Sequence, residues 1–379
     1  MYPRILKKQI QQKFFSGKAL LLTGARQTGK TTLSLELIHE MVHQKQLKVF
    51  NCDNPTDREL LTNKDLDFLR HLVAEAKVIF IDEGQKVTTI GQTVKLLVDF
   101  YKKEKQILVT GSSSINLLDS VEEALTGRKF VYTLFPLSLE ESFPDKDILT
   151  ITKELETLMI FGSYPDVVKE ISLEKKIELL RELHSSYLYK DIFEFQRIKN
   201  SDLVIKLVKA LALQIGSEVS YSELANLVGI DKKTVEHYLD LLEKSFVVFR
   251  LSPYTRNKRR EISQLKKVYF YDLGIRHAVI NNFNFLENRN DVGAIWENFA
   301  IVERLKYRQY HNLYASQYFW RTYDGSEVDL IEEREGKLYG YECKWGKKFK
   351  EHHKPLRWLE YPESSFQYIT PSHLIGFVL

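Results

Sequence analysis

Short apolar runs alternate with amphipathic stretches through the first 150 residues of the chain. Five of these runs predict strands, and the stretches between them place apolar residues at helical spacing. The predicted strands are residues 19–23, 48–52, 78–82, 107–110 and 130–134. Because strands and helices that alternate in this way usually build a mostly parallel sheet, the pattern predicts an α/β fold for the N-terminal part.

The pattern changes after Pro136, where leucines and charged residues recur at helical spacing with a break at residues 162–165. Helical spacing continues from Ser201 to about Arg250, and residues 267–271 and 318–341 return to strand-like composition. We therefore predict four parts. They are an α/β core (1–145), a helical lid or linker (146–200), a helix-rich region of winged-helix type (201–270) and a second α/β domain (271–379).

The composition is that of a globular chain, with 44% hydrophobic and 28% charged residues. Residues 1–18 lack the apolar core of a signal peptide, and no run approaches the roughly 20 apolar residues of a membrane helix. Cys52 and Cys343 lie far apart and form no C-x-x-C pair, which argues against a disulfide framework or a zinc site. We expect a cytoplasmic protein that has no membrane partner.

A glycine-rich loop follows the first predicted strand and leads directly into a helical pattern. Residues 24–31 read Gly-Ala-Arg-Gln-Thr-Gly-Lys-Thr, which matches the G-x-x-x-x-G-K-[ST] phosphate-binding pattern. In this strand–loop–helix setting, backbone N–H groups cradle phosphate oxygens. Lys30 is expected to reach the terminal phosphates, and the Thr31 hydroxyl to bind Mg²⁺.

Two adjacent carboxylates follow the strand predicted at residues 78–82, at the end where α/β sheets bind ligands. We expect Asp82 to hold Mg²⁺ and Glu83 to polarise the attacking water, so the sequence predicts hydrolysis of ATP as well as binding. The residues expected to hold the nucleotide are Gly24, Ala25, Arg26, Gln27, Thr28, Gly29, Lys30, Thr31, Thr32, Asp82 and Ser112.

Two further polar residues have both a functional and a structural interpretation. Ser112 follows the strand at 107–110, where a hydroxyl can sense the terminal phosphate, although a turn with a helix N-cap at Ser113 or Ser114 explains the serines equally well. Arg128 follows a predicted helix over residues 115–125. It is either an arginine finger, acting in cis or from a neighbouring subunit, or an ordinary surface arginine.

These motifs together resemble the prokaryotic AAA+ ATPase family, and in particular its bacterial and archaeal branch that carries a C-terminal domain of unknown function. The resemblance spans nearly the whole chain. It implies that Thr110 or Ser112 takes the place of the first sensor and Arg128 that of the arginine finger, which would require a homo-oligomer if it acts in trans. The segments that carry it are residues 24–32, 79–83, 110–112, 127–128 and 135–138.

A helix, a glycine turn and a second helix are predicted over residues 220–235, with Asp231 as the cap of the second helix. Residues 246–251 and 267–271 are expected to form a wing beside it. The net charge of +4 does not decide between duplex DNA and protein docking, and both stay open. Residues expected to be available to a duplex are Lys232, Lys233, Thr234, His237, Tyr238, Arg256, Lys258, Arg259 and Arg260.

Asp329 and the run Glu342-Cys343-Lys344 fall on two adjoining predicted strands, and alternation places Glu342 and Lys344 on one face. Asp329 and Glu342 can share a divalent cation while Lys344 positions a water, with Glu297 as a third carboxylate. This arrangement resembles the restriction-endonuclease-like superfamily. A salt-bridged pair of strands is the alternative.

The sequence thus predicts an ATPase in which Lys30, Glu83 and Arg128 act in catalysis and whose nucleotide state controls a DNA-associated C-terminal half. A nucleotide-dependent switch that regulates protein partners is one alternative. An ATPase-gated, metal-dependent nuclease is another.

Overall fold

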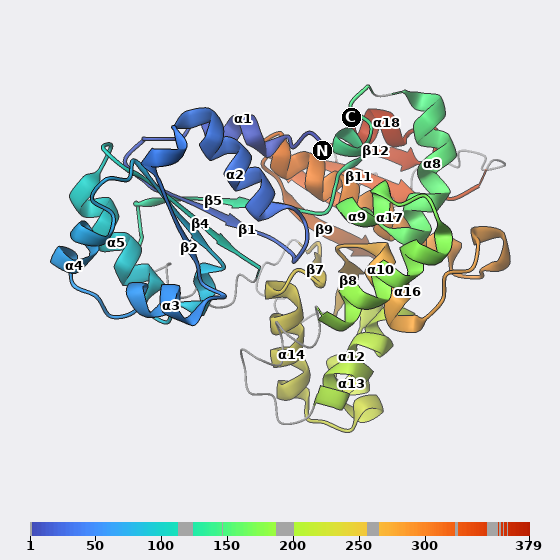
Figure 1. The fold of residues 1–379 in the computed structure, drawn as a ribbon. Coiled ribbons are helices and arrows are strands. Elements are labelled where there is room, and N and C mark those ends of the chain that lie inside the picture. The colour runs from blue at the N-terminus through green and yellow to red at the C-terminus, as the bar shows by residue number, and fades with distance from the viewer. Residues whose placement is uncertain are drawn as a thin grey trace. The chain divides into compact units, whose positions relative to one another are not determined.

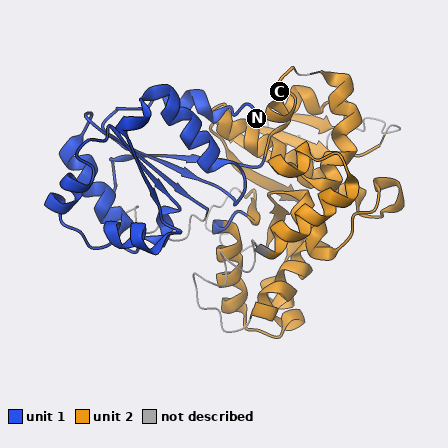
Figure 2. Cartoon of the chain, in the orientation of Figure 1, with its two compact units in different colours: residues 1–136, 244–246 blue, residues 137–243, 247–379 orange. Residues whose placement is uncertain are grey.

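The computed structural model describes residues 2–379 except 113–123, 146, 187–200, 256–264, 323–324, 347–354, 356–357, 359 and 362. Ser113, Ser114, most of the predicted helix 115–125 and the basic residues from Arg256 to Arg260 therefore lie outside the described residues. The chain forms two compact units (Figure 2). Unit 1 comprises residues 1–136 and 244–246, and unit 2 comprises residues 137–243 and 247–379.

Unit 1 contains a five-stranded sheet in the order β2-β3-β4-β1-β5, in which every neighbouring pair is parallel (Figure 1). Each strand lies within one residue of its predicted range, so the α/β fold with a parallel sheet is confirmed. The strands are β1 (Ala19–Thr23), β2 (Leu47–Asn51), β3 (Val78–Asp82), β4 (Gln106–Gly111) and β5 (Lys129–Thr133).

The core of unit 1 forms where helices cover the central strands. All residues of β1 and β4 are buried, whereas the edge strand β2 buries only Phe50 fully. One face of the sheet packs Leu21, Ile79 and Val109 against Val94 of α5. Strands buried on both faces are stiff, so they fix the positions of the residues that follow them. The helices are α1 (Leu6–Gln11), α2 (Lys30–Met41), α3 (Pro55–Leu61), α4 (Leu66–Leu72) and α5 (Ile90–Tyr101).

Unit 2 contains a seven-stranded mixed sheet in the order β12-β11-β10-β9-β7-β8-β6. Neighbours pair antiparallel except β7 with β9 and β11 with β12, which are parallel. Strands from the helix-rich region and from the last part of the chain therefore belong to one sheet. The strands are β6 (Glu218–Val219), β7 (Val248–Pro253), β8 (Lys266–Phe270), β9 (Ser316–Arg321), β10 (Glu327–Arg334), β11 (Lys337–Cys343) and β12 (Ser364–Ile369).

The predicted break at residues 162–165 is present and is tightly packed. Gly162 adopts a left-handed φ of 74°, and a Cβ at this position would lie 2.1 Å from Asp272 Oδ1. Asp272 caps α16 by accepting from Ile275 N at 3.1 Å and also accepts from Ser163 N at 2.7 Å. The helices around this point are α7 (Leu139–Ser142), α8 (Ile148–Phe161), α9 (Pro165–Lys169), α10 (Leu173–Ser186), α16 (Leu273–Ile280), α17 (Val292–Tyr310) and α18 (Leu374–Val378).

The predicted helix pair with its glycine turn is also present. After α12 (Ser201–Leu213), α13 (Tyr221–Val228) ends at Gly229, whose φ is 81°, and α14 (Lys232–Lys244) begins after Asp231, which accepts from Thr234 N at 3.0 Å. Arg250 of β7 donates to Asp240 at 2.6 Å and to Glu243. The strand is thereby tied to α14, and it pairs antiparallel with β8.

His277 supplies a pH-dependent contact inside unit 2. Its buried Nδ1 lies 2.7 Å from the carbonyl oxygen of Ile160. Burial, together with Arg276 and Arg289, lowers the pKa of His277 from 6.5 to about 3. His277 is therefore protonated near pH 6.5 in the unfolded chain but only near pH 3 in the folded chain.

The contribution of His277 to the free energy of unfolding should thus be fully present above pH 6.5, the pKa in the unfolded chain. It should fall by about 2 kcal/mol between pH 7 and pH 5. Urea unfolding followed by tryptophan fluorescence measures this change, because all four tryptophans lie in unit 2. His277→Gln should lower stability at pH 7 and flatten the pH dependence, whereas the exposed-site control His43→Gln should leave both unchanged. An equal pH slope in His277→Gln and the wild type would contradict this assignment.

Candidate functional site

The loop between β1 and α2 has the backbone geometry of a phosphate cradle. Gly24 has a φ of 142°, and a Cβ there would lie 2.1 Å from the carbonyl oxygen of Leu134. Gly29 begins α2 with a left-handed φ of 93°, and Gln27 is also left-handed with a φ of 56°. Only glycine fits at residue 24, so this part of the motif is fixed by packing as well as by its chemistry.

Lys30 is held inside this loop. Its Nζ donates to the carbonyl oxygens of Gly24 at 2.9 Å and Ala25 at 2.7 Å, and the residue is only 5% exposed. The Thr28 hydroxyl donates to Ala25 O at 3.0 Å. A buried ammonium that is held by carbonyl oxygens at the start of a helix is a favourable place for a phosphate anion, because its N–H groups can donate charge-assisted hydrogen bonds to phosphate oxygens.

Thr31 joins the loop to the end of β3. Its Oγ1 lies 2.9 Å from Asp82 Oδ2 and 3.1 Å from Oδ1, and the Thr110 hydroxyl also donates to Asp82. Burial raises the pKa of Asp82, whereas the hydrogen bonds from Thr110 and Thr31 lower it. A hydroxyl and a carboxylate side by side are the hard oxygen ligands that Mg²⁺ prefers, so these residues fit that ion.

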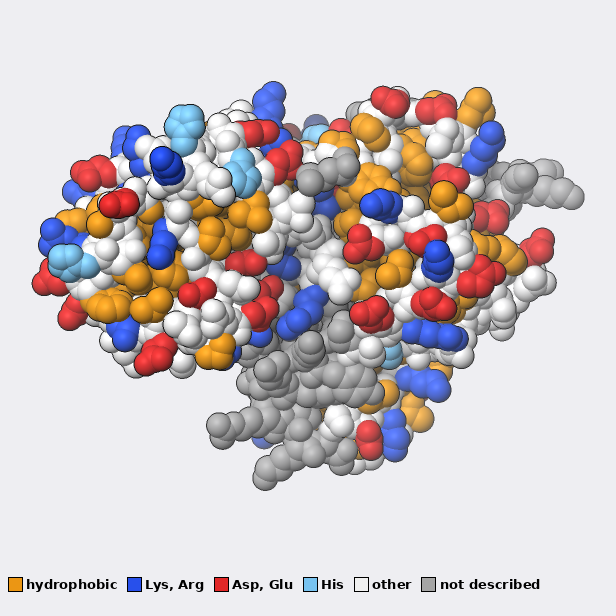
Figure 3. Space-filling model, in the orientation of Figure 1, with side chains coloured by type: hydrophobic (Ala, Val, Ile, Leu, Met, Phe, Trp, Pro, Cys, Tyr) orange, Lys and Arg blue, Asp and Glu red, His pale blue; other side chains and the backbone are white. Residues whose placement is uncertain are grey.

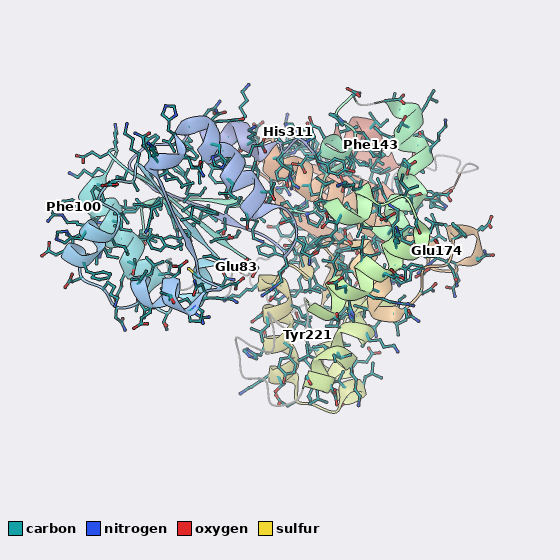
Figure 4. All side chains as sticks on the ribbon, viewed as in Figure 1. Glu83, Phe100, Phe143, Glu174, Tyr221 and His311 are labelled. Atoms are coloured by element: carbon teal, nitrogen blue, oxygen red, sulfur yellow. The ribbon has the colours of Figure 1, made fainter. Side chains whose placement is uncertain are left out.

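Glu83 lies directly beyond β3 in a left-handed conformation, with a φ of 54° (Figure 4). Its Oε2 accepts from Gln85 Nε2 at 2.5 Å and from Ser112 Oγ at 3.0 Å, and Gln85 Nε2 also lies 2.9 Å from Ser112 Oγ. Gln85 is buried, and its Oε1 has no hydrogen-bond partner among the described residues. The carboxylate is therefore held at one oxygen by two donors.

Arg128 lies at the amino ends of the strands of this sheet, whereas the residues described above lie at the carboxyl ends. It precedes β5, and its carbonyl oxygen accepts from Ala19 N, the first residue of β1, at 2.9 Å. The loop at residues 24–31 follows the last residue of β1, and five strand residues span roughly 16 Å. Arg128 Nε contacts Asp99 Oδ1 at 2.5 Å. Within one chain Arg128 is therefore too far from the loop to touch a phosphate bound there.

Two of the three acidic residues predicted in the C-terminal part, Glu297 and Asp329, meet in unit 2 at a buried lysine of β8, together with Glu327, which was not predicted. Lys267 Nζ lies 2.5 Å from Glu327 Oε1, 3.0 Å from Glu297 Oε1 and 3.5 Å from Asp329 Oδ1. Tyr269 OH donates to the same Glu297 oxygen at 2.6 Å. The expected neighbours Glu297 and Asp329 are thus brought together around an ammonium group.

Glu342 and Lys344 form a second pair, with Lys344 Nζ 2.6 Å from Glu342 Oε1. Burial raises the pKa of Glu297 to about 8 and that of Glu342 to about 7, and the nearby Asp329 adds to both shifts. Although burial lowers the pKa of Lys267, the carboxylates of Glu297, Asp329 and Glu327 raise it well above its ordinary value.

In the described part of the chain, no group of three or more His, Cys, Asp or Glu side chains is arranged to hold a metal ion.

Three family models match the chain. Residues 16–143 match the AAA domain, residues 152–285 match the domain of unknown function DUF8612, and residues 292–370 match the domain of unknown function DUF4143. The N-terminal part of the chain is therefore similar to AAA domains. This match supports the AAA+ ATPase family, and with it ATP binding and hydrolysis at the level of the family.

Several known proteins are similar to this chain. An uncharacterized protein of Mycobacterium tuberculosis is 27% identical over 338 residues, covering 89% of this chain and 72% of the relative. An uncharacterized protein of Methanocaldococcus jannaschii is 25% identical over 413 residues, covering 99% and 90%. The replication factor C small subunit of Saccharolobus solfataricus is 25% identical over 143 residues, covering 36% and 42%. AMPPCP-bound DnaA from Aquifex aeolicus aligns at 13% identity over 64% of this chain and 86% of DnaA, with a TM-score of 0.32.

Within unit 1, the structure brings predicted residues of the phosphate loop and of the ends of β3 and β4 together at the carboxyl ends of the strands. Arg128 is the exception. Gln85 was not predicted from the sequence, although its position two residues after Glu83 is a usable signal, because an amide there can turn back onto the carboxylate. The residues at the carboxyl edge are Gly24, Lys30, Thr31, Asp82, Glu83, Gln85, Thr110 and Ser112.

In unit 2, the second helix of the helix pair buries its apolar side chains and exposes its basic ones, an arrangement that fits either duplex DNA or a protein as the partner. Lys232, Lys233 and His237 are exposed on α14, while Val235 and Leu239 are buried. On the face drawn in Figure 3, Lys and Arg side chains are interspersed with Asp and Glu rather than gathered in one patch. No helix among the described residues is long and apolar enough to cross a membrane.

Proposed function

We propose that this chain is a AAA+-type ATPase that binds ATP with Mg²⁺ at residues 24–32 and hydrolyses it, and whose nucleotide state controls a DNA-associated C-terminal half. The observation that carries the proposal is the direct contact between Thr31 and Asp82, 2.9 Å apart, beside Glu83. This contact supports Thr31 and Asp82 as the magnesium ligands and the neighbouring Glu83 as the base.

Each of these side chains has its own role in ATP hydrolysis. Lys30 exchanges its loop carbonyls for phosphate oxygens and neutralises charge on the terminal phosphates. Thr31 and Asp82 would hold Mg²⁺, which when bound offsets charge that develops on the phosphate oxygens. Glu83 orients the attacking water and accepts its proton, and Gln85 and Ser112 hold the carboxylate for that task. Ser112 and Thr110 connect the end of β4 to the same carboxylates.

Arg128 fits this scheme as a residue that acts in trans. It lies at the amino edge of the sheet, so it can reach only a nucleotide that is bound to a neighbouring copy of the chain. To do so it must exchange Asp99 for phosphate oxygens. Because both members of the ion pair are partly exposed, at 40% and 44%, this exchange costs little. The proposal therefore includes a homo-oligomer in which neighbouring AAA domains complete one another's sites.

The DNA-associated role rests on the helix pair in unit 2. Lys232 and Lys233 stand at the exposed start of α14, the second helix, where a duplex-reading helix carries its contacts. The partial likeness of this chain, over 143 residues, to a replication factor C small subunit supports the same proposal. Both observations support duplex DNA as the partner.

Fluorescence anisotropy with a labelled duplex tests this part of the proposal. We expect the wild type to bind in a salt-dependent manner. The double variant Lys232→Ala/Lys233→Ala should bind at least about 10-fold more weakly, with a salt slope lower by about two. The control Lys169→Ala/Lys175→Ala removes the same charge from exposed sites elsewhere in unit 2 and should bind like the wild type. No binding by the wild type at low salt would remove DNA from the account.

A nucleotide-dependent switch that regulates protein partners is the second candidate. Leu213 at the end of α12 and Leu227 of α13 are 64% and 65% exposed, which is more typical of a protein-docking surface than of a DNA contact. ATP turnover that duplex DNA leaves unchanged would favour this candidate over the first.

A further inference from the structure

The acidic centre of unit 2 already contains a cation that belongs to the protein. The Lys267 ammonium lies within 3.5 Å of one oxygen from each of Glu297, Glu327 and Asp329. An ammonium has three N–H donors and no acceptor, so three carboxylates match its hydrogen-bonding capacity. We infer that Lys267 takes the position of a metal ion in this centre, so that the C-terminal sheet is a metal-free scaffold rather than a metal-dependent nuclease.

The backbone holds Lys267 in this position. Its strand β8 lies inside the sheet, between β7 and β6. Lys267 pairs with Leu251 of β7 on one side and with Glu218 of β6 on the other. Its side chain is 2% exposed. A lysine that is fixed in a sheet and closed off from water cannot swing away to admit a metal ion without breaking three ion pairs.

Three of the four oxygens of the predicted ligands Asp329 and Glu342 already contact protein nitrogens. Such an ion needs several oxygens at about 2.0–2.6 Å around one point. The point shared by Glu297, Glu327 and Asp329 is filled by nitrogen. The second oxygen of Asp329 accepts from Cys343 N at 2.8 Å, and one oxygen of Glu342 is paired with Lys344. Among the described residues, Glu342 Oε2 is the one oxygen of Asp329 and Glu342 that has no such contact.

Electrostatic repulsion also argues against a metal ion in this centre. A divalent ion bound by Asp329 would lie close to the Lys267 ammonium, and two cations in a buried site repel strongly. The predicted pair Asp329 and Glu342 is thus present, but each of its carboxylates already lies beside an ammonium group, Lys267 for Asp329 and Lys344 for Glu342. Cleavage of a phosphodiester by a bound metal is not expected at this centre.

Mn²⁺ binding to the full-length chain, measured without nucleotide by the electron paramagnetic resonance signal of free Mn²⁺, tests the inference. The wild type and Asp329→Asn should bind the same amount of Mn²⁺. Asn keeps an acceptor for Cys343 N, so this variant should remain folded. Lys267→Met, which removes the ammonium but keeps most of the side-chain volume, should gain one bound Mn²⁺ per chain, and adding Asp329→Asn should remove it.

Thermal melting checks that these variants are folded. Lys267→Met should melt at a lower temperature than the wild type because it leaves buried carboxylates unpaired, and Mn²⁺ should raise its melting temperature without affecting the wild type. One extra Mn²⁺ in the wild type compared with Asp329→Asn would overturn the inference. Folded Lys267→Met that gains no Mn²⁺ would also overturn it. If Lys267→Met does not fold, the comparison of the wild type with Asp329→Asn decides alone.

Discussion

Lys30→Ala should reduce ATP hydrolysis by about 100-fold or more, to the background of the assay. The variant removes the buried ammonium that two loop carbonyls hold at the phosphate position, while the small Ala side chain leaves the backbone of α2 undisturbed. Without that charge, neither the bound triphosphate nor the charge developing on it is neutralised. Phosphate release at saturating ATP and Mg²⁺ measures the effect.

Lys45→Ala is the matched control, because Lys45 is an exposed lysine of the same unit outside the loop. We expect it to hydrolyse ATP at the wild-type rate. Wild-type turnover in Lys30→Ala would show that the loop is not the site of hydrolysis.

Glu83→Gln should separate ATP binding from ATP hydrolysis. The change keeps the size of the side chain but removes the carboxylate that accepts a proton from water, so turnover should fall by about 10²- to 10⁴-fold. ATP binding should persist, because Lys30, Thr31 and Asp82 are unchanged. Equilibrium binding of a fluorescent ATP analogue and phosphate release on the same samples measure the two quantities.

The control for this variant is Glu75→Gln, which alters an exposed glutamate of unit 1 away from the carboxyl edge. It should bind and hydrolyse ATP normally. If Glu83→Gln turned over ATP at the wild-type rate, another group would have to act as the base. Loss of ATP binding in Glu83→Gln would instead show that Glu83 holds the nucleotide.

The phosphate loop and the strands of unit 1 could be predicted because their signals are local. The run from Gly24 to Thr31 requires a strand before it and a helix after it, and both are adjacent in the sequence. The break at Gly162 was visible for the same reason, although the carboxylate of Asp272 that packs against it was not.

The contacts of Gln85 and Lys267 could not be predicted, because they depend on which strands become neighbours. Gln85 meets Ser112 only because β3 lies next to β4. Lys267 comes from β8, which two other strands separate from β10 and its Asp329. No spacing in the sequence encodes these approaches. The alternation that placed Glu342 and Lys344 on one face is a local signal, and these two residues do contact each other.

The direction of the strands decides which nucleotide Arg128 can reach. The sequence left its action in cis or in trans open. Because all five strands of the sheet are parallel, a residue that precedes β5 lies at the edge opposite the loop that follows β1. This geometry leaves action in trans as the one form in which an arginine finger at this position fits the fold.

Phosphate release from ATP by the wild type, measured with Mg²⁺ across protein concentration and with and without duplex DNA, tests the central claim most directly. The account predicts turnover that requires Mg²⁺, rises per chain as the concentration increases and is stimulated by duplex DNA. Turnover no higher than that of Lys30→Ala under every condition would contradict it.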